Sequence, residues 1–267
     1  MKKIFYTSII LTTLVAHTAM AKDIYTFGIV PQQAASKLAK LWAPILKEVS
    51  NQSGVKLIFA TAPSIPKFEE KLLQGKYDFS YMNPYHFITY NKENGYSAIA
   101  KQAGKRIKGV IVAHKESGIK NLSDLNGKEI AFPAPKAFAA SLLPSAELKK
   151  QNINFIPKYV KSHDSVYQNI ANKRFIAGGG IERTLSNTNP AAKEQLEVIW
   201  TTKGYTPHAI AAHSNIDPII VQKVQNAFLS LNNSEKGKNL LKNIKFKGIE
   251  KAADNDWDDI RSLNLEN

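Results

Sequence analysis

Short apolar runs alternate with segments of helical periodicity along almost the whole chain, and this alternation limits the possible folds more than any other feature. Residues 24–30 form an apolar run of strand length. After this run, Leu38, Trp42 and Ile45 recur at spacings of three or four residues and therefore share one face of a helix. The same pattern continues towards the C-terminus and predicts an α/β protein.

The expected elements follow from the apolar runs and from the residues that start and stop helices. The expected strands cover residues 24–30, 55–60, 77–82, 96–100, 107–113, 129–132, 155–160, 175–177 and 195–201, with an extended segment at 207–212. The expected helices lie before Gly54, at 66–75, 84–94, 136–150 and 164–172, and from Asp217 onward, and Pro44 predicts a kink or a late start in the first of them. No linker rich in Pro or Gly divides the chain, so any two lobes would be joined by ordinary strands.

The first 21 residues are typical of a cleavable signal peptide. Lys2 and Lys3 supply a positive start, residues 4–15 are mostly apolar, and Ala19 and Ala21 fit a small-x-small cleavage site. We therefore expect an exported, periplasmic protein that begins at Lys22. No Cys follows the cleavage site, so no lipid anchor is expected there. About 245 residues remain, which is enough chain for a substantial core.

Composition narrows the classes of site and partner. The absence of Cys excludes disulfides, thiol catalysis and zinc sites built on cysteine. The formal net charge is +14, or +12 without Lys2 and Lys3. The lysines are scattered and form no basic run, so nucleic-acid binding is not expected. A solvated basic surface or an anionic ligand accounts for the charge.

Four segments at the ends of expected strands carry the candidate site residues. In the first, Tyr81 ends a strand and Asn83 is placed to cap the next helix. Pro84 suits the first position of that helix, because the N–H that proline lacks would have no partner there. The free N–H groups of such a first turn bind anions or polar ligands. Tyr85 lies beside them, so Tyr81, Asn83 and Tyr85 are candidate ligand-binding residues; a well-capped helix with core aromatics is the alternative.

The second segment follows the expected strand at 129–132. Two prolines stiffen its loop, and the small residues after them allow backbone N–H groups to approach a ligand closely. Lys136 adds a positive charge. The candidate ligand-binding residues here are Lys136, Ala137, Phe138, Ala139 and Ser141; an ordinary proline-stiffened loop is the alternative.

The third and fourth segments supply the remaining candidates. His163 and Ser165 lie at a helix start, where an imidazole can donate to an anion. The run Ser162-His163-Asp164 is not a catalytic triad, because neighbours in sequence cannot point at one another as a triad requires. Glu182 follows the Gly run at 178–180, which lacks the spacing of a P-loop.

No metal, cofactor or catalytic site is expected. His208 and His213 are five residues apart on an extended segment and therefore face opposite sides. The C-terminal aspartates from Asp254 to Asp259 lack the EF-hand pattern, and we interpret them as a solvated helix start. All four candidate segments follow strands, and in open α/β sheets ligands bind outside the carboxyl ends of the strands. The sequence thus predicts one polar pocket that captures a ligand without transforming it.

Three motifs resemble one known family. Residues 77–86 (YDFSYMNPYH), 131–135 (AFPAP) and 162–167 (SHDSVY) are similar to the phosphate/phosphite/phosphonate-binding periplasmic proteins of ABC importers, and the resemblance extends over residues 27–257. Membership implies a type II periplasmic binding fold with two α/β lobes, 22–110 with 208–267 and 111–207, joined by a two-strand hinge near 109–114 and 207–213. It also implies that the turn at 137–141, with Tyr81 and His163, holds a small oxyanion, and that Glu182 takes an amine of the ligand.

The resemblance implies partners as well as a fold. A closed, monomeric binding protein would deliver its ligand to an ABC permease in the inner membrane. A sensory protein of the same fold, which would dock on a sensor kinase, is the alternative, and so is a receptor for a different small solute. The turn at 136–141 departs from the Ser/Thr-rich turn of many members, since Ser141 is its only hydroxyl.

Overall fold

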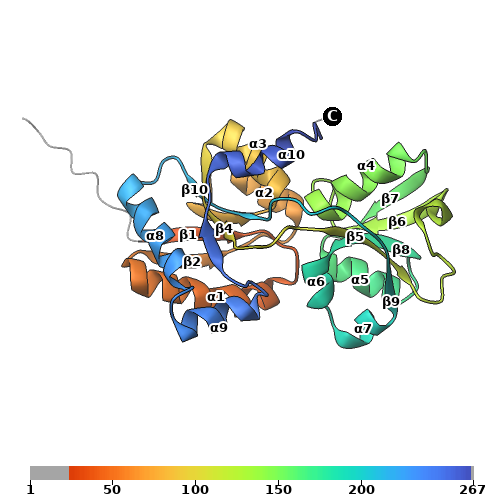
Figure 1. Cartoon of the computed structure of the whole chain (residues 1–267), viewed down its shortest axis with the longest axis horizontal. Coiled ribbons are helices and arrows are strands. Elements are labelled where there is room, and N and C mark those ends of the chain that lie inside the picture. Colours follow the sequence, from red (N-terminus) through yellow and green to blue (C-terminus); the bar gives the residue numbers. More distant parts are fainter. Residues whose placement is uncertain (1–23, 266–267) are drawn as a thin grey trace, which may run out of the picture.

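The computed structural model describes residues 24–265, and the predicted signal peptide lies outside this range. The described strands form two separate sheets, each with its own helices (Figure 1). The first sheet has the order β11-β4-β10-β3-β1-β2 and the second has the order β7-β6-β8-β5-β9. We call the two halves of the molecule, one around each sheet, the first and the second lobe.

The first lobe combines both ends of the chain. Its strands are β1 (Ile24–Ile29), β2 (Lys56–Ala60), β3 (Phe79–Met82), β4 (Tyr96–Gln102), β10 (Ala209–His213) and β11 (Ile249–Lys251). Its helices are α1 (Ala35–Ser53), α2 (Ile65–Leu73), α3 (Pro84–Asn94), α8 (Pro218–Ser230), α9 (Glu235–Asn243), the 3₁₀ turn η3 (Asp254–Trp257) and α10 (Asp258–Arg261). Strands β1, β2 and β3 pair in parallel, whereas β10 is antiparallel to both β3 and β4.

The second lobe is continuous in sequence. Its strands are β5 (Gly109–His114), β6 (Lys128–Phe132), β7 (Phe155–Tyr159), β8 (Ala177–Ile181) and β9 (Leu196–Thr201). Its helical elements are η1 (Leu122–Leu125), η2 (Phe138–Leu142), α4 (Leu143–Lys150), α5 (His163–Ala171), α6 (Glu182–Ser186) and α7 (Pro190–Glu194). One apolar cluster around Ile111 and Phe132 and another around Val110 and Tyr167 form its core.

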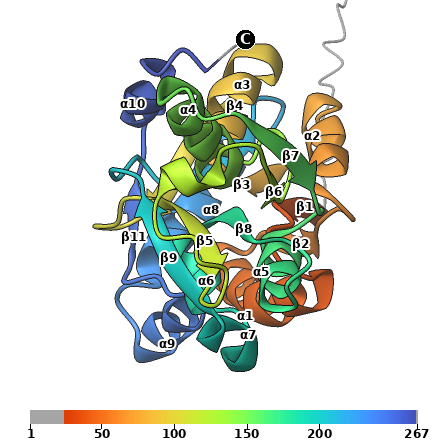
Figure 2. The same cartoon turned by 90° about the vertical axis from the view of Figure 1, so that its right-hand side faces the viewer.

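Two segments connect the lobes, one between β4 and β5 and one between β9 and β10 (Figure 1). Figure 2 views the molecule from the side of the second lobe, which lies in front of the first. They pair with each other through Ile107 and Tyr205, whose N–H groups donate to each other's carbonyl oxygens at 2.7 and 3.0 Å. The hinge therefore lies at residues 103–108 and 202–208. The predicted hinge segments, 109–114 and 207–213, were both placed too late. Strand β5 is already paired with β8 and β9, and β10 (Ala209–His213) is already paired with β3 and β4.

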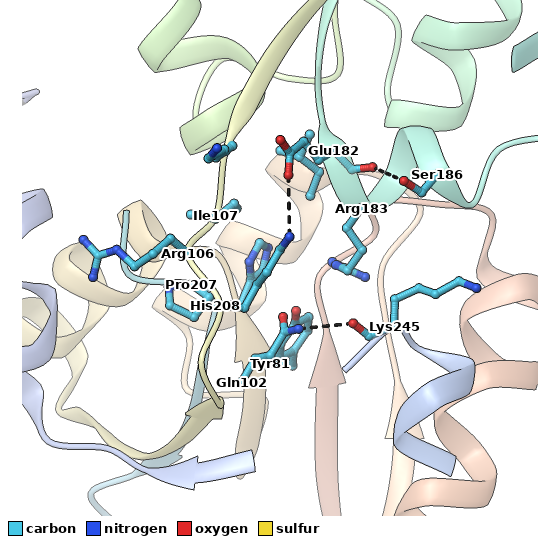
Figure 3. Close-up of a pocket in the computed structure, with 13 residues that line it drawn as sticks. Tyr81, Gln102, Arg106, Ile107, Glu182, Arg183, Ser186, Pro207, His208 and Lys245 are labelled. Atoms are coloured by element: carbon cyan, nitrogen blue, oxygen red, sulfur yellow. Dashed lines mark hydrogen bonds and ion pairs between the residues drawn. The ribbon is translucent and has the colours of Figure 1, made fainter. Parts of the chain in front are cut away.

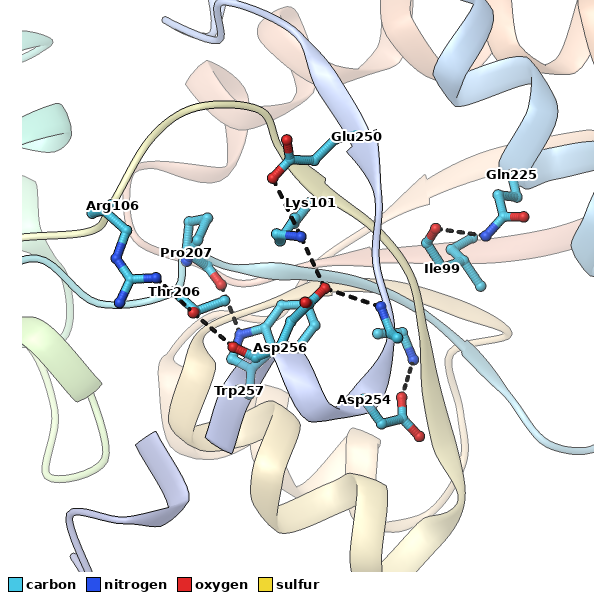
Figure 4. A network of polar contacts seen from close by, with 12 residues as sticks. Ile99, Lys101, Arg106, Thr206, Pro207, Gln225, Glu250, Asp254, Asp256 and Trp257 are labelled. Atoms are coloured by element: carbon cyan, nitrogen blue, oxygen red, sulfur yellow. Dashed lines mark hydrogen bonds and ion pairs between the residues drawn. The ribbon is translucent and has the colours of Figure 1, made fainter. Parts of the chain in front are cut away.

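The C-terminal segment is hydrogen-bonded to both connecting segments and so links them to the first lobe (Figure 4). Asp259 accepts hydrogen bonds from Arg106 of the first connection and from the N–H of Thr206 of the second. The indole of Trp257 donates to the carbonyl oxygen of Pro207 at 2.8 Å. The aspartates at 254–259 were predicted to be a solvated helix start. That interpretation was incomplete, because Asp259 is bonded into the hinge.

Three further local predictions can be compared with the structure. Pro44 lies inside α1, which runs from Ala35 to Ser53, so the helix does not start late at this proline. The strand expected at 175–177 is β8, Ala177–Ile181, so the Gly run lies in the middle of a sheet instead of after a strand. The helix expected at 136–150 begins as the π-helical turn η2 and becomes α-helical only at Leu143.

Candidate ligand-binding site

The four candidate segments meet between the lobes. Asn83 at the start of α3, Phe138 in η2, His163 at the start of α5 and Ile181 at the end of β8 all border one interlobe cavity. Its volume is about 10 Å³, which is room for about one water. The apolar cluster of the first lobe continues across to Phe138 and Ile181. The structure is therefore the closed form, with the lobes in contact.

Direct hydrogen bonds hold the closed form together. The carbonyl oxygen of Gln32 accepts from the N–H of His163 at 3.0 Å, and its side-chain oxygen accepts from Arg183 at 2.5 Å. Asn83 caps α3 by accepting from the N–H of His86, and its amide also donates to the carbonyl oxygen of Lys136 at 3.2 Å. The predicted helix cap at Asn83 is thus also a contact between the lobes.

Residues 137–140, at the start of the turn η2, border the small cavity. The first N–H groups of a helical turn have no partner inside it, and that of Ala137 donates to the carbonyl oxygen of Ala134 at 3.3 Å. The carbonyl groups of Ala139 and Ala140 in the same turn pack against two glycines. A Cβ at Gly109 would lie 1.9 Å from the carbonyl oxygen of Ala139, and one at Gly179 would lie 1.9 Å from that of Ala140. Glycine is therefore required in β5 and β8 for the turn to sit where it does.

His163 is buried and neutral. Burial lowers the pKa of its imidazole to about 3, and the charge of Arg183 acts in the same direction. Its Nδ1 lies 3.2 Å from the hydroxyl of Thr184, which lies 2.8 Å from the hydroxyl of Tyr167. A neutral imidazole held in this way has one nitrogen left for the cavity.

His208 is a site residue that sequence reasoning missed. It borders both the small cavity and a larger one beside it. Its ring stacks on Tyr81 with centroids 4.9 Å apart, and only 3% of the residue is exposed. Among the described residues its Nε2 has no hydrogen-bond partner. Burial, helped by Arg183, lowers its pKa well below the usual range, so this nitrogen belongs to a neutral ring.

The larger cavity lies on the hinge side of the small one and has a volume of about 190 Å³ (Figure 3). Tyr81 and His208 form one wall, and Glu182 and Arg183 at the start of α6 form another. Arg183 reaches from α6 toward Tyr81 and His208 (Figure 3). Arg183 was not among the predicted site residues, although its charge lowers the pKa of both His163 and His208.

The predicted site residues divide into two groups. Those that border one of the two cavities are Tyr81, Asn83, Ala137, Phe138, Ala139, His163 and Glu182. Those that do not are Tyr85, Lys136, Ser141 and Ser165. Tyr85 packs against the core of the first lobe, the side chain of Lys136 is exposed, and the hydroxyl of Ser165 lies 3.0 Å from that of Ser162. The hydroxyl of Ser141 is buried and has no partner among the described residues.

Residues 24–265 contain neither a cluster of metal-binding side chains nor a helix that could span a membrane. In that range no three His, Asp or Glu side chains come close enough together to hold a metal ion. His208 borders the interlobe cavities, whereas the ring of His213 packs edge-on against Tyr96. Across the same residues, no helix has both the length and the apolar character needed to cross a membrane.

Known proteins share this sequence pattern and this architecture. Residues 27–257 match the family described as "ABC transporter, phosphonate, periplasmic substrate-binding protein". The phosphate-import protein PhnD of Mycolicibacterium smegmatis is 22% identical over 229 residues, which are 77% of this chain and 71% of that protein.

Solved structures agree with the family match. A binding protein component of an ABC phosphonate transporter from Pseudomonas aeruginosa aligns with a TM-score of 0.84 at 18% identity, over 90% of this chain and 85% of the other. PhnD1 of Prochlorococcus marinus, in complex with methylphosphonate, aligns with a TM-score of 0.83 at 18% identity, over 91% and 97%. These similarities confirm the predicted type II periplasmic binding fold. The chain belongs to the family of periplasmic substrate-binding proteins of phosphonate ABC transporters.

Proposed function

We propose that this protein captures a small phosphorus oxyanion, such as phosphonate, phosphite or phosphate, between the lobes where the four segments meet. The small cavity there has room for only about one water, so the lobes must stand slightly further apart when the ligand is bound. The observation that carries the proposal is the buried, unpartnered Nε2 of His208 at the wall of that cavity. A buried polar atom without a partner costs about 1–3 kcal/mol. A ligand oxygen that accepts a hydrogen bond from this ring recovers that cost only in the closed, ligand-bound form.

The other groups around the cavity support the same ligand class. The N–H groups of η2 and the free nitrogen of His163 can act as neutral donors at the small cavity, and Arg183 adds a positive charge from the wall of the larger cavity beside it. Neutral dipoles aimed at a buried anion stabilise it without requiring a counter-charge for each oxygen. The Ala-rich sequence of η2 does not weaken such a site, because the donors are backbone groups.

The proposal extends to compartment, partner and role. Positive residues, an apolar run and small residues at the N-terminus support export to the periplasm by a cleavable signal peptide. A monomer divided near residues 110 and 207 would close on its ligand and present the closed form to an ABC permease. Among residues 24–265, the neutral His163 and His208 form no hydrogen bond with a serine hydroxyl, and this arrangement supports a role in binding and not in catalysis.

The test is ligand binding by protein that has been unfolded and refolded, which releases any ligand carried over from the cell. Methylphosphonate, phosphite and phosphate are each titrated by calorimetry and by thermal shift. At a hundredfold excess over Kd a ligand stabilises the folded state by about 2.7 kcal/mol. The absence of heat and of a shift with all three at millimolar concentration would overturn the proposal.

A pair of matched variants tests the role of His208. His208→Phe keeps a ring against Tyr81 but removes both nitrogens, whereas His213→Phe makes the same change where the ring packs against Tyr96. We expect His208→Phe to weaken oxyanion binding about tenfold or more. His213→Phe leaves affinity unchanged. Equal affinities of the two variants would remove His208 from the site.

A further inference from the structure

The two cavities are neighbours that share a wall. Ile107, Ile181 and His208 border both of them. An oxyanion held at the small cavity would therefore direct its substituent past these side chains into the larger one. With about 190 Å³ available, and about 30 Å³ per water in the liquid, the larger cavity takes a group of about six non-hydrogen atoms. A methyl substituent would leave most of this space to solvent.

The charges around the larger cavity are mostly positive, but they are not equivalent. The guanidinium of Arg106 is bonded to Asp259 and points away from the cavity (Figure 3). Arg183 points into it, and its partner is the neutral side chain of Gln32. Within residues 24–265 the structure gives Arg183 no acidic partner. Its charge is therefore available to a ligand.

The one acidic side chain of the described cavity wall is already paired. A carboxylate oxygen of Glu182 lies 3.6 Å from the ammonium of Lys105. A ligand amine would have to displace Lys105 and would also meet the charge of Arg183. A ligand anion meets no such obstacle, because Arg183 is oriented toward the space and is not neutralised.

We propose that the ligand of this protein is a phosphorus oxyanion whose substituent ends in a carboxylate, with Arg183 binding that carboxylate in the larger cavity. The inference rests on the proposed oxyanion site and adds the identity of the substituent. The resemblance to the family implied an amine contact at Glu182. The pairing of Glu182 with Lys105 and the free charge of Arg183 reverse that expectation for this chain.

Four probes that differ only in the substituent test the proposal on refolded, full-length protein. Methylphosphonate reports on the oxyanion site alone, and ethylphosphonate adds an uncharged substituent. Phosphonoacetate adds a carboxylate, and 2-aminoethylphosphonate adds an amine. A charge-assisted contact is worth about tenfold in affinity or more, so we expect phosphonoacetate to bind about tenfold tighter than ethylphosphonate and 2-aminoethylphosphonate to bind more weakly than either.

Arg183→Gln and Arg106→Gln form a matched pair, since both arginines border the cavity and only one points into it. The readout is the ratio of the affinities for phosphonoacetate and ethylphosphonate, which cancels any loss at the oxyanion site itself. We expect Arg183→Gln to bring this ratio close to one, and Arg106→Gln to keep the wild-type ratio.

The outcomes separate this inference from the function on which it rests. Binding of methylphosphonate without any preference for phosphonoacetate overturns the carboxylate site and leaves the oxyanion site standing. A preference for 2-aminoethylphosphonate does the same and restores Glu182 as the contact. Binding of none of the four probes overturns both proposals.

Discussion

The hydroxyl of Thr184 lies 3.2 Å from Nδ1 of His163, and this contact sets which ring nitrogen faces the ligand. The N–H of Ile181 donates to the hydroxyl of Tyr167 at 3.1 Å, and that hydroxyl lies 2.8 Å from the one of Thr184. The carbonyl oxygen of Ile181 also lies 3.2 Å from the hydroxyl of Tyr167 and 3.1 Å from that of Thr184. We propose that Tyr167 donates to this carbonyl oxygen and that Thr184 donates to Nδ1. The proton of the neutral ring is then on Nε2, where it can be donated to an anion.

The first prediction is that Thr184 acts through His163. Thr184→Val keeps the shape of the side chain but removes the hydroxyl, so the ring loses the donor that fixes its tautomer. We expect oxyanion affinity to fall about fivefold to tenfold, the range of one neutral hydrogen bond. Thr184→Ser restores the hydroxyl and should rescue binding. Nitrogen NMR of labelled histidine should show a proton on Nε2 in wild type and mixed tautomers in Thr184→Val.

The second prediction concerns pH. Burial lowers the pKa of His163 to about 3 and that of His208 well below 6.5, and the charge of Arg183 adds to both shifts. An unfolded chain protonates these imidazoles near pH 6.5, whereas the folded chain does not. Their contribution to stability is therefore complete above pH 6.5 and is lost as the pH falls from there toward 3. Each imidazole lowers the free energy of unfolding by about 1.4 kcal/mol per pH unit in this window.

Urea unfolding at several pH values between 4 and 7 measures this slope. Carboxylates contribute to the total, so the informative quantity is the difference between wild type and His163→Phe or His208→Phe. Each variant should show a shallower slope by up to about 1.4 kcal/mol per pH unit. Slopes that stay parallel to wild type in both variants would mean that the histidines are not neutral in the folded protein.

Local sequence signals predicted the bounds of some elements correctly and those of others incorrectly. Helix α3 has the predicted bounds, because both of its ends are marked by local residues. Asn83 caps its start and Pro84 opens its first turn, and the left-handed Gly95 follows its last residue. The strand β8 was misplaced, because three successive glycines carry no side-chain pattern. Their place in the sheet follows from the contacts of Gly178 and Gly179 with distant β6 and η2.

The candidate site, like the fold, has residues that local sequence signals identify and residues that depend on distant contacts. Its strand-end segments could be found because each one precedes a helix start. His208 and Arg183 could not be found in this way, since their role depends on the hinge and on lobe closure. The position of His208 one residue before an apolar strand, at the end of a connection between lobes, is the signal that could have identified it.

The third prediction concerns the packing behind η2. Gly109→Ala places a methyl group 1.9 Å from the carbonyl oxygen of Ala139, so the turn must move. We expect a loss of about 1–3 kcal/mol in unfolding free energy and weaker oxyanion binding, because the N–H donors move with the turn. Gly127→Ala is the control. Its Cβ meets open space, but its φ of +72° costs about 1 kcal/mol of backbone strain. It should lower stability and leave affinity unchanged.

The fourth prediction concerns the hinge. Asp259 accepts from Arg106 and from the N–H of Thr206 at 2.9 Å, so it holds both connecting segments. Asp259→Ala should speed hydrogen exchange at the amides of Ile107 and Tyr205, which pair across the hinge. The neighbouring change Asp258→Ala removes only an exposed pair with Arg261 and should leave exchange at these amides unaltered. Equal exchange in the two variants would show that Asp259 does not stiffen the hinge.

The order of strands in the first sheet has a consequence for how the chain acquires its structure. Strand β10 lies between β3 and β4, so these two earlier strands have no common partner until residues 209–213 join them. The second lobe needs only residues 109–201. We expect the second lobe to become resistant to protease before the first lobe does, because its contacts are closer in sequence. The first lobe, although its strand β1 is made first, would then be the last to fold.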